Sequence, residues 1–240
     1  MDNSIYISLS RQTALFRNME ITSNNVANMN TPGFNAQRLV FSDYLVKDGN
    51  LKDAYANDPS TYRDTSTGSI NMTGNTFDLA INGPGYFQVQ TNVGKRYTKA
   101  GNFSLDSNGT LINASGYPVL GADGGEIVIP PNVRNVSING VGQVTGDGEE
   151  IAQIGMVEFK DQQRMVRQGA TLYDSKETPT PAEESRMVQG GFESANVNPV
   201  TEMVKVMEIS RSVANTAKFT ETMYDLERKT SSTYTHSQTA

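Results

Sequence analysis

Residues 77–114 read FDLAINGPGYFQVQTNVGKRYTKAGNFSLDSNGTLINA, in which short runs of β-forming residues alternate with glycine-containing turns. Helical spacing of apolar residues is absent from this stretch. Asn82-Gly83 and Asn108-Gly109 are pairs that favour tight turns, because both residue types tolerate the backbone angles that a hairpin needs. We therefore expect a hairpin with its tip at Asn108-Gly109, and antiparallel β structure around it.

The same pattern continues towards the C-terminus, in the runs EIVIP (126–130), NVSIN (135–139) and IAQIGMVEF (151–159). The sequence thus predicts a mainly β middle domain over residues 73–196, antiparallel and resembling a sandwich or barrel. Four glycines are expected to shape its turns without a direct functional role: Gly83, Gly85, Gly109 and Gly116.

An amphipathic helix is predicted at the N-terminal end, from about residue 4 to residue 27. Positions 5, 9, 12, 16, 19, 23 and 26 follow one another at alternating steps of four and three, which is the spacing of a coiled-coil seam. Five of these seven positions are apolar: Ile5, Leu9, Phe16, Met19 and Val26. The following NNVANMNTPGF is rich in residues that stop a helix. We assign residues 1–30 to this segment and residues 31–72 to an extended connector.

A second helix is predicted in the C-terminal segment 197–240. Asn198 suits the N-cap and Pro199 the first helical position, and Glu202 in the first turn complements the helix dipole. The apolar positions expected to form its seam are Met203, Val206, Met207 and Val213. The polar, Ser/Thr-rich run after Leu226 predicts that the helix frays there.

Composition narrows the possible functions. The net charge of −6 argues against a nucleic-acid partner, which requires basic surface. The chain has no cysteine, so disulfides, thiolate zinc sites and thiol nucleophiles are excluded, and His236 is the only histidine. We therefore expect no metal site, no cofactor and no histidine-based catalytic triad.

The remaining candidates for chemistry are interpreted as turns and solvated loops. Glu149-Glu150 and Glu183-Glu184 are neighbours in sequence, and neighbours on a strand point to opposite faces. The stretch Gly83-Pro84-Gly85 begins like a dinucleotide-binding loop but no helical pattern follows it, and Asp106–Gly109 begins like a calcium loop but Tyr117 stands where the last ligand would be. The sequence therefore predicts that the protein is not an enzyme and has no small-molecule substrate.

Two helices at opposite ends of one chain favour an assembly protein. Each helix carries apolar residues outside its main seam, so each can face more than one neighbour. A repeated head-to-tail contact that does not close would produce a helical tube. No apolar run approaches the ~20 residues needed to span a bilayer, and the opening MDNSIYISLS lacks the basic and apolar parts of a secretion signal.

Four segments, in this order along the chain, resemble motifs of the flagellar rod and hook family. They are NNVANMNTPGF (24–34), TGNTFDLAINGPGYFQVQ (73–90), YTKAGNFSLDSNGTLINASGYPVLG (97–121) and QGGFESANVNPVTEMVKVM (189–207). Together they extend over most of the chain. The length of 240 residues and the opening MDNSIY are similar to the proximal-rod type, with the distal-rod type as the alternative.

The resemblance implies a structural subunit that leaves the cytoplasm through the flagellar type III export apparatus, without a cleaved signal. It implies polymerisation in the periplasm with other rod subunits and with copies of itself, into a shaft that transmits torque. The terminal helices would pair, and their nine seam residues would make contacts between helices and between subunits. A wall-remodelling hydrolase, with a cleft of convergent carboxylates, and a surface adhesin, which needs no helical ends, are the alternatives from other classes.

Overall fold

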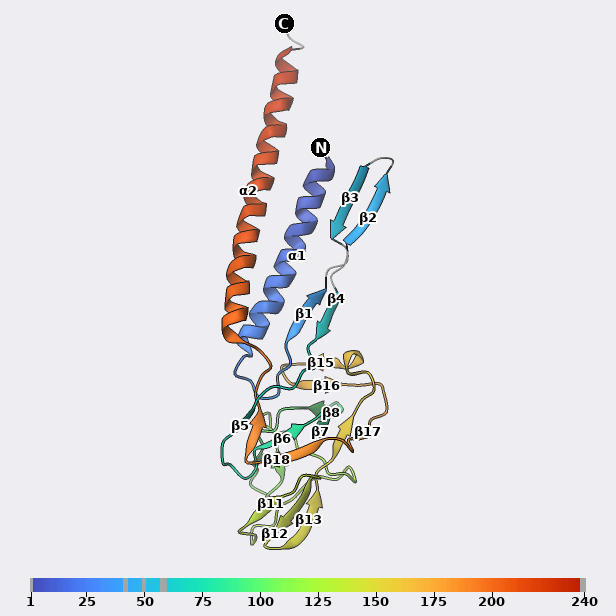
Figure 1. Cartoon of the computed structure of the whole chain (residues 1–240), viewed down its shortest axis with the longest axis vertical. Helices are drawn as coiled ribbons and strands as arrows, with labels where there is room; N and C mark the ends of the chain where they lie inside the picture. The colour runs from blue at the N-terminus through green and yellow to red at the C-terminus, as the bar shows by residue number, and fades with distance from the viewer. Residues whose placement is uncertain (1, 41–42, 49–50, 57–59, 238–240) are drawn as a thin grey trace. The chain divides into compact units, whose positions relative to one another are not determined.

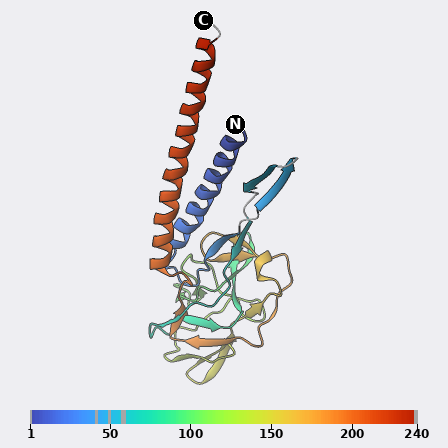
Figure 2. The ribbon, with the colours of Figure 1, turned by 45° about the horizontal axis from the view of Figure 1, so that its top comes forward.

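The computed structural model describes residues 2–40, 43–48, 51–56 and 60–237 (Figures 1 and 2). The chain divides into two compact units. The helical unit contains the described parts of residues 1–27, 37–62 and 198–240, and the β unit contains residues 28–36 and 63–197. The segment predicted as a connector, 31–72, is shared between the two units.

The helical unit is built on two helices, α1 (Asp2–Ala27) and α2 (Pro199–Ser237). They run antiparallel, since residue 8 of α1 contacts residue 220 of α2 and residue 25 contacts residue 202. The unit also contains β1 (Gln37–Val40), paired with β4 (Ser60–Arg63), and a hairpin formed by β2 (Asp43–Asp48) and β3 (Leu51–Ala56).

Both helices are confirmed, with starts close to the predicted ones. The side chain of Asn198 accepts a hydrogen bond from the Thr201 amide at 3.1 Å, so Asn198 is the N-cap. The prediction that the helix frays after Leu226 is wrong, because α2 continues to Ser237. Residues 227–237 contain no glycine or proline, and serine and threonine lower helix propensity by only up to ~0.7 kcal/mol each relative to alanine.

The β unit confirms the predicted antiparallel fold class. Its largest sheet has six strands in the order β15-β16-β8-β7-β14-β17, and a three-stranded sheet has the order β11-β12-β13. Two-stranded ladders join β9 to β10, β18 to β6 and β19 to β5. The strands are β5 (Ile70–Met72), β6 (Leu79–Asn82), β7 (Tyr86–Thr91), β8 (Gly94–Thr98), β9 (Ser104–Leu105), β10 (Leu111–Ile112), β11 (Val136–Ile138), β12 (Gln143–Gly146), β13 (Glu149–Gln153), β14 (Met156–Glu158), β15 (Val166–Gln168), β16 (Leu172–Asp174), β17 (Thr180–Pro181), β18 (Arg186–Gln189) and β19 (Gly191–Glu193).

The predicted hairpin at Asn108-Gly109 is present between β9 and β10. Asp106 organises its turn, because one carboxylate oxygen accepts the amides of Asn108 and Thr110, each at 2.8 Å. The Thr110 amide and the other donors of this turn stabilise the carboxylate and hold the pKa of Asp106 below its usual value. Asp106 therefore stabilises a turn, as predicted from the sequence, in which Asp106–Gly109 was not interpreted as a calcium loop.

The turn glycines predicted from the sequence adopt different geometries. Gly83, Gly109 and Gly116 have positive φ angles of 136°, 80° and 79°. Gly85 lies close to Ser185, whose hydroxyl oxygen accepts the Gly85 amide at 3.0 Å. Their assignment as turn formers without a direct functional role stays a prediction.

The apolar interior of the β unit lies in two main clusters. The larger one gathers residues from β6, β7, β10, β11 and β12, among them Leu79, Phe87 and Leu111, which are almost fully buried. The second is aromatic, with Tyr86, Tyr97, Phe159 and Tyr173 in edge-to-face contacts. A small third cluster joins Phe34 and Ala36 to Val197, so residues from before and after the β-rich segment share one core.

Candidate functional site

The buried positions of α1 and α2 carry mostly small and polar side chains, with Ile21 and Ile209 as the large apolar exceptions. Among the described side chains of α2 the buried positions are seven residues apart, at Glu202, Ile209 and Thr216. From residue 7 onward, the buried positions of α1 are Ser8, Ala14, Ile21, Thr22 and Asn25. The hydroxyls of Thr22 and Thr216 donate to carbonyls of their own helices, at 2.8 and 2.9 Å.

The large apolar residues of the predicted seams lie elsewhere. Leu9 is 56% exposed, Phe16 51%, Met203 47% and Met207 54%, so these four side chains contribute little to the contact between α1 and α2. At 3.6 residues per turn, Leu9 and Phe16 lie roughly 150° around α1 from the face that meets α2. Met19, Val26, Val206 and Val213 are half-buried, and the side chain of Ile5 lies outside the described residues. Contacts between subunits through these positions stay a prediction.

A buried carboxylate joins three segments of the helical unit. The Glu202 side chain is 2% exposed and accepts hydrogen bonds from Arg38 Nη1 at 2.7 Å and Lys205 Nζ at 2.9 Å. Its other oxygen accepts from Asn25 Nδ2 at 3.3 Å. Burial alone would raise the pKa of Glu202, but the bonds from Lys205, Arg38 and Asn25 outweigh burial and lower this pKa below its usual value.

Asn25 extends this set of bonds to β1. Its side-chain nitrogen donates to the Gln37 carbonyl at 2.8 Å, and its side-chain oxygen accepts the Gln37 amide at 3.0 Å. The side-chain amide of Asn25 thus exchanges two hydrogen bonds with the Gln37 backbone, as the backbone of a paired β-strand does. We call Asn25, Gln37, Arg38 and Glu202 the polar node; it connects the end of α1, the start of β1 and the start of α2.

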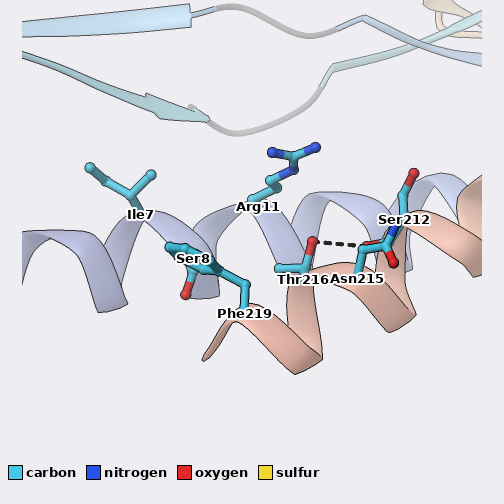
Figure 3. Close-up of a pocket in the computed structure, with 7 residues that line it drawn as sticks. All are labelled: Ile7, Ser8, Arg11, Ser212, Asn215, Thr216 and Phe219. Atoms are coloured by element: carbon cyan, nitrogen blue, oxygen red, sulfur yellow. Dashed lines mark hydrogen bonds between the residues drawn. The ribbon is translucent and has the colours of Figure 1, made fainter. Parts of the chain in front are cut away.

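A groove of about 480 Å³ opens between the two helices (Figure 3). Ile7, Ser8 and Arg11 line it from α1, and Ser212, Asn215, Thr216 and Phe219 line it from α2. None of these seven residues is acidic, and the described part of the chain contains no group of three or more His, Cys, Asp and Glu side chains suited to hold a metal ion. No helix in the described ranges is long and apolar enough to cross a membrane.

The segments that carry the family resemblance meet inside the β unit. Gly33, with φ +65°, lies so close to another segment that a Cβ would come within 2.2 Å of the Ala100 backbone nitrogen. The Gly33 amide donates to the Glu193 carbonyl at 2.7 Å. Residues of NTPGF, YTKAG and GGFES therefore contact one another, and we call this contact region the motif junction.

An ion pair is buried at the motif junction. Lys99 Nζ lies 3.6 Å from a Glu193 carboxylate oxygen, and the two side chains are 1% and 2% exposed. Lys99 also donates to the Gly83 carbonyl at 3.2 Å, and the other Glu193 oxygen accepts the Gly68 amide at 2.8 Å. Burial raises the pKa of Glu193, although Lys99 and the Gly68 amide oppose that change.

Asn196 connects its own segment by hydrogen bonds to two others, one at residues 34–36 and one at residue 64. Its side-chain oxygen accepts the Ala36 amide at 2.7 Å, its side-chain nitrogen donates to the Asp64 carbonyl at 2.9 Å, and its backbone amide donates to the Phe34 carbonyl at 3.2 Å. Both parts of the β unit, 28–36 and 63–197, are held together here.

Sequence reasoning did not identify the polar node or the motif junction. The search for apolar periodicity passed over the stripe 202, 209 and 216, because two of its three residues are polar. It interpreted Asn25 and Gly33 only as helix-stopping residues. The seven-residue spacing of Glu202, Ile209 and Thr216 was the available signal.

Three family models match successive parts of the chain. The model described as flagella basal body rod protein matches residues 5–35, and the flagellar hook protein FlgE/F/G D1 domain matches residues 80–146. The model described as flagellar basal body rod FlgEFG protein C-terminal matches residues 188–233.

Curated relatives align over most of their own length. The flagellar basal-body rod protein FlgF of Caulobacter vibrioides is 36% identical, over 95% of this chain and 96% of that protein. FlgF of Mesorhizobium japonicum is 35% identical, over 90% and 91% of the two chains. The flagellar basal-body rod protein FlgG of Bacillus subtilis is 32% identical, over 92% and 95%.

Proposed function

The chain belongs to the flagellar basal-body rod proteins of the F type and is a structural subunit of the rod, and on that premise we propose that it polymerises in the proximal rod. The proposal includes a periplasmic position, export through the type III apparatus without a cleaved signal, and transmission of torque. The partners proposed are copies of this chain and other rod subunits.

One observation carries the proposal: the helix pair exposes its large apolar side chains. Leu9, Phe16, Met203 and Met207 are each about half exposed, while the buried positions of α1 and α2 carry mostly small and polar residues. Covering the exposed halves of these four side chains would contribute on the order of 3–6 kcal/mol per subunit. Neighbouring helices of other subunits are the cover that we propose.

An open assembly follows if the apolar residues of α1 in one subunit contact those of α2 in the next, and we propose this head-to-tail contact. A head-to-tail contact that does not close on itself propagates as a filament. We propose that the nine seam residues make these contacts, with Leu9, Phe16, Met203 and Met207 as the largest contributors.

The rival hydrolase hypothesis requires unpaired carboxylates that converge in a cleft. A hollow of about 720 Å³ in the β unit is lined by Asp161, Asp174 and Glu177 among other residues. Asp161 pairs with Arg164 at 3.1 Å, and Asp174 pairs with Arg96 at 3.4 Å. The adjacent glutamates 149-150 and 183-184 are all exposed. These pairings and exposures favour a structural role over a catalytic one.

The experiment that tests the function is electron microscopy of basal bodies from a strain that lacks this gene, together with a motility assay. We expect loss of swimming and rods that end near their base. Rods that keep a proximal segment and lack the distal one would favour the distal alternative. Normal swimming with complete rods would overturn the proposal.

Leu9→Asp is expected to prevent incorporation into the rod and to abolish motility, because a charge would replace an apolar side chain at a proposed subunit contact. The purified variant should unfold at the wild-type temperature within about 2 °C, since surface substitutions usually change stability by less than ~0.5 kcal/mol. Motility, basal-body micrographs and thermal unfolding of the variant check this.

Val93→Asp is the matched control, because it makes the same type of change at an apolar residue that is 75% exposed in the β unit. We expect this variant to swim normally. Normal swimming of Leu9→Asp as well, at wild-type protein levels, would remove Leu9 from the proposed interface.

A further inference from the structure

We propose that the polar node is a register lock: the bond between Asn25 and Glu202 fixes how far α1 is shifted along α2. The inference concerns a positioning role for residues that lie away from the apolar faces. Only the purpose of the register, which is to align the apolar faces of α1 and α2, rests on the proposed function.

Two side-chain bonds between α1 and α2 lie far apart on the pair. One is Asn25 with Glu202, and the other joins the hydroxyls of Ser8 and Thr220 at 3.1 Å. They are separated by seventeen residues on α1 and eighteen on α2, which is about 26 Å of helix. Both bonds are therefore satisfied in one and the same antiparallel register.

The contact face offers few large apolar residues that could select that register. Ala14, Ile21 and Ile209 are the buried apolar residues among the described side chains of the two helices, and the hydroxyls of Thr22 and Thr216 donate to carbonyls within their own helices. Direction-dependent polar bonds are what distinguishes one register from the next, as buried polar residues do in coiled coils.

Glu202 is suited to this role because a buried carboxylate that loses its hydrogen-bond donors destabilises the fold. Its side chain is 2% exposed, and three donors from α1, β1 and α2 surround the carboxylate. A slip of α1 would remove Asn25 from Glu202 and would also disturb the two bonds between Asn25 and Gln37. The register of α1 is thus tied to β1 as well as to α2.

Disulfide trapping can measure the register, since the chain has no native cysteine. The double variant S8C/T220C reports the register of the structure, and S8C/T216C reports a slip by about one turn. The rate of disulfide formation in the purified full-length chain is followed by thiol labelling and mass spectrometry. We expect S8C/T220C to oxidise at least tenfold faster than S8C/T216C.

Adding Glu202→Ala to both double variants should reduce this ratio at least fivefold, and adding Glu202→Gln should reduce it less, because glutamine keeps one acceptor oxygen. Glu208→Ala is the matched control, since Glu208 is an exposed glutamate on the same helix. The control should leave the ratio unchanged. Circular dichroism of every variant verifies that the helices are present.

An unchanged ratio in Glu202→Ala would overturn the register lock, and so would a failure of both double variants to form a disulfide in the wild-type background. The measurement needs no rod assembly. A chain whose register depends on Glu202 but that forms no rod would therefore contradict the proposed function alone.

Discussion

Gly33→Ala is expected to lower the stability of the β unit by about 2–5 kcal/mol, through a left-handed backbone conformation and forced overpacking. Gly33 has φ +65°, where a side chain costs energy in any surroundings. The added Cβ would also lie 2.2 Å from the Ala100 nitrogen and 2.4 Å from the Lys99 carbonyl carbon. Both are backbone atoms, so no side-chain rotation relieves the collision.

Gly116→Ala separates the two effects. Gly116 has a similar φ of +79°, but nothing lies within 4 Å of a Cβ built there. We expect this control to lose only about 1 kcal/mol, from the backbone term. Urea unfolding of the full-length variants, followed by tyrosine fluorescence, measures the difference. Equal losses in the two variants would show that the close approach at the motif junction is not important for stability.

Lys99→Met is expected to destabilise the β unit by about 3–5 kcal/mol at neutral pH, because it leaves the Glu193 carboxylate buried without its counter-ion. The double variant Lys99→Met/Glu193→Gln should recover a large part of that loss. Glutamine removes the charge and keeps an oxygen for the Gly68 amide, which now donates to Glu193 at 2.8 Å. A double variant as unstable as the sum of the single variants would mean that the two charges are not coupled.

The loss in Lys99→Met should depend on pH. Burial already raises the pKa of Glu193 in the folded protein, and removal of Lys99 raises this pKa further. The folded state then binds a proton more readily than the unfolded state, so stability falls as the pH rises through the window between the two pKa values. Lys99→Met should thus be less destabilised at pH 5 than at pH 8.

A surface ion pair provides the control for this measurement. Arg164 and Asp161 are 3.1 Å apart, with side chains that are 83% and 47% exposed. Arg164→Met should change stability by no more than ~1 kcal/mol. A similar loss in Lys99→Met would contradict the importance assigned to the buried pair.

The helices, the antiparallel fold class and the family were predictable from the sequence. Asn198-Pro199 marked the start of α2, and Asn108-Gly109 marked the β9–β10 turn, because capping and turn formation depend on nearest neighbours. The resemblance to the rod and hook family is confirmed by relatives that align over about nine-tenths of the chain or more. Both FlgF and FlgG proteins are among these relatives, and the F-type assignment rests on the two FlgF proteins at 36% and 35% identity.

The contact face of the helix pair could not be predicted by the same means. Apolar periodicity identified Leu9 and Phe16, which lie on the outer side of α1, and missed Asn25 and Glu202 on the inner side. The method assumes that apolar residues face the nearest partner. In this helix pair the buried positions carry mostly small and polar residues, so the assumption fails for Leu9 and Phe16.

The motif junction was hidden for a different reason. Gly33, Lys99 and Glu193 are separated by 66 and 94 residues, and their proximity follows from the path of the whole β unit. Local patterns contain no information about such a path. The motifs of the resemblance marked these positions without revealing that they touch.

The bonds of Asn196 have a consequence for the modularity of the chain. The Ala36 amide is 2.7 Å from the Asn196 side-chain oxygen, and the Asp64 carbonyl is 2.9 Å from its nitrogen. The places where the backbone leaves the β unit after Ala36, re-enters it before Asp64 and leaves it again after Asn196 are thus adjacent. A cassette with adjacent ends can be lengthened, shortened or exchanged without changing the gap that its host must bridge. The terminal helices can therefore remain the same while the insert between Asp64 and Asn196 evolves in size.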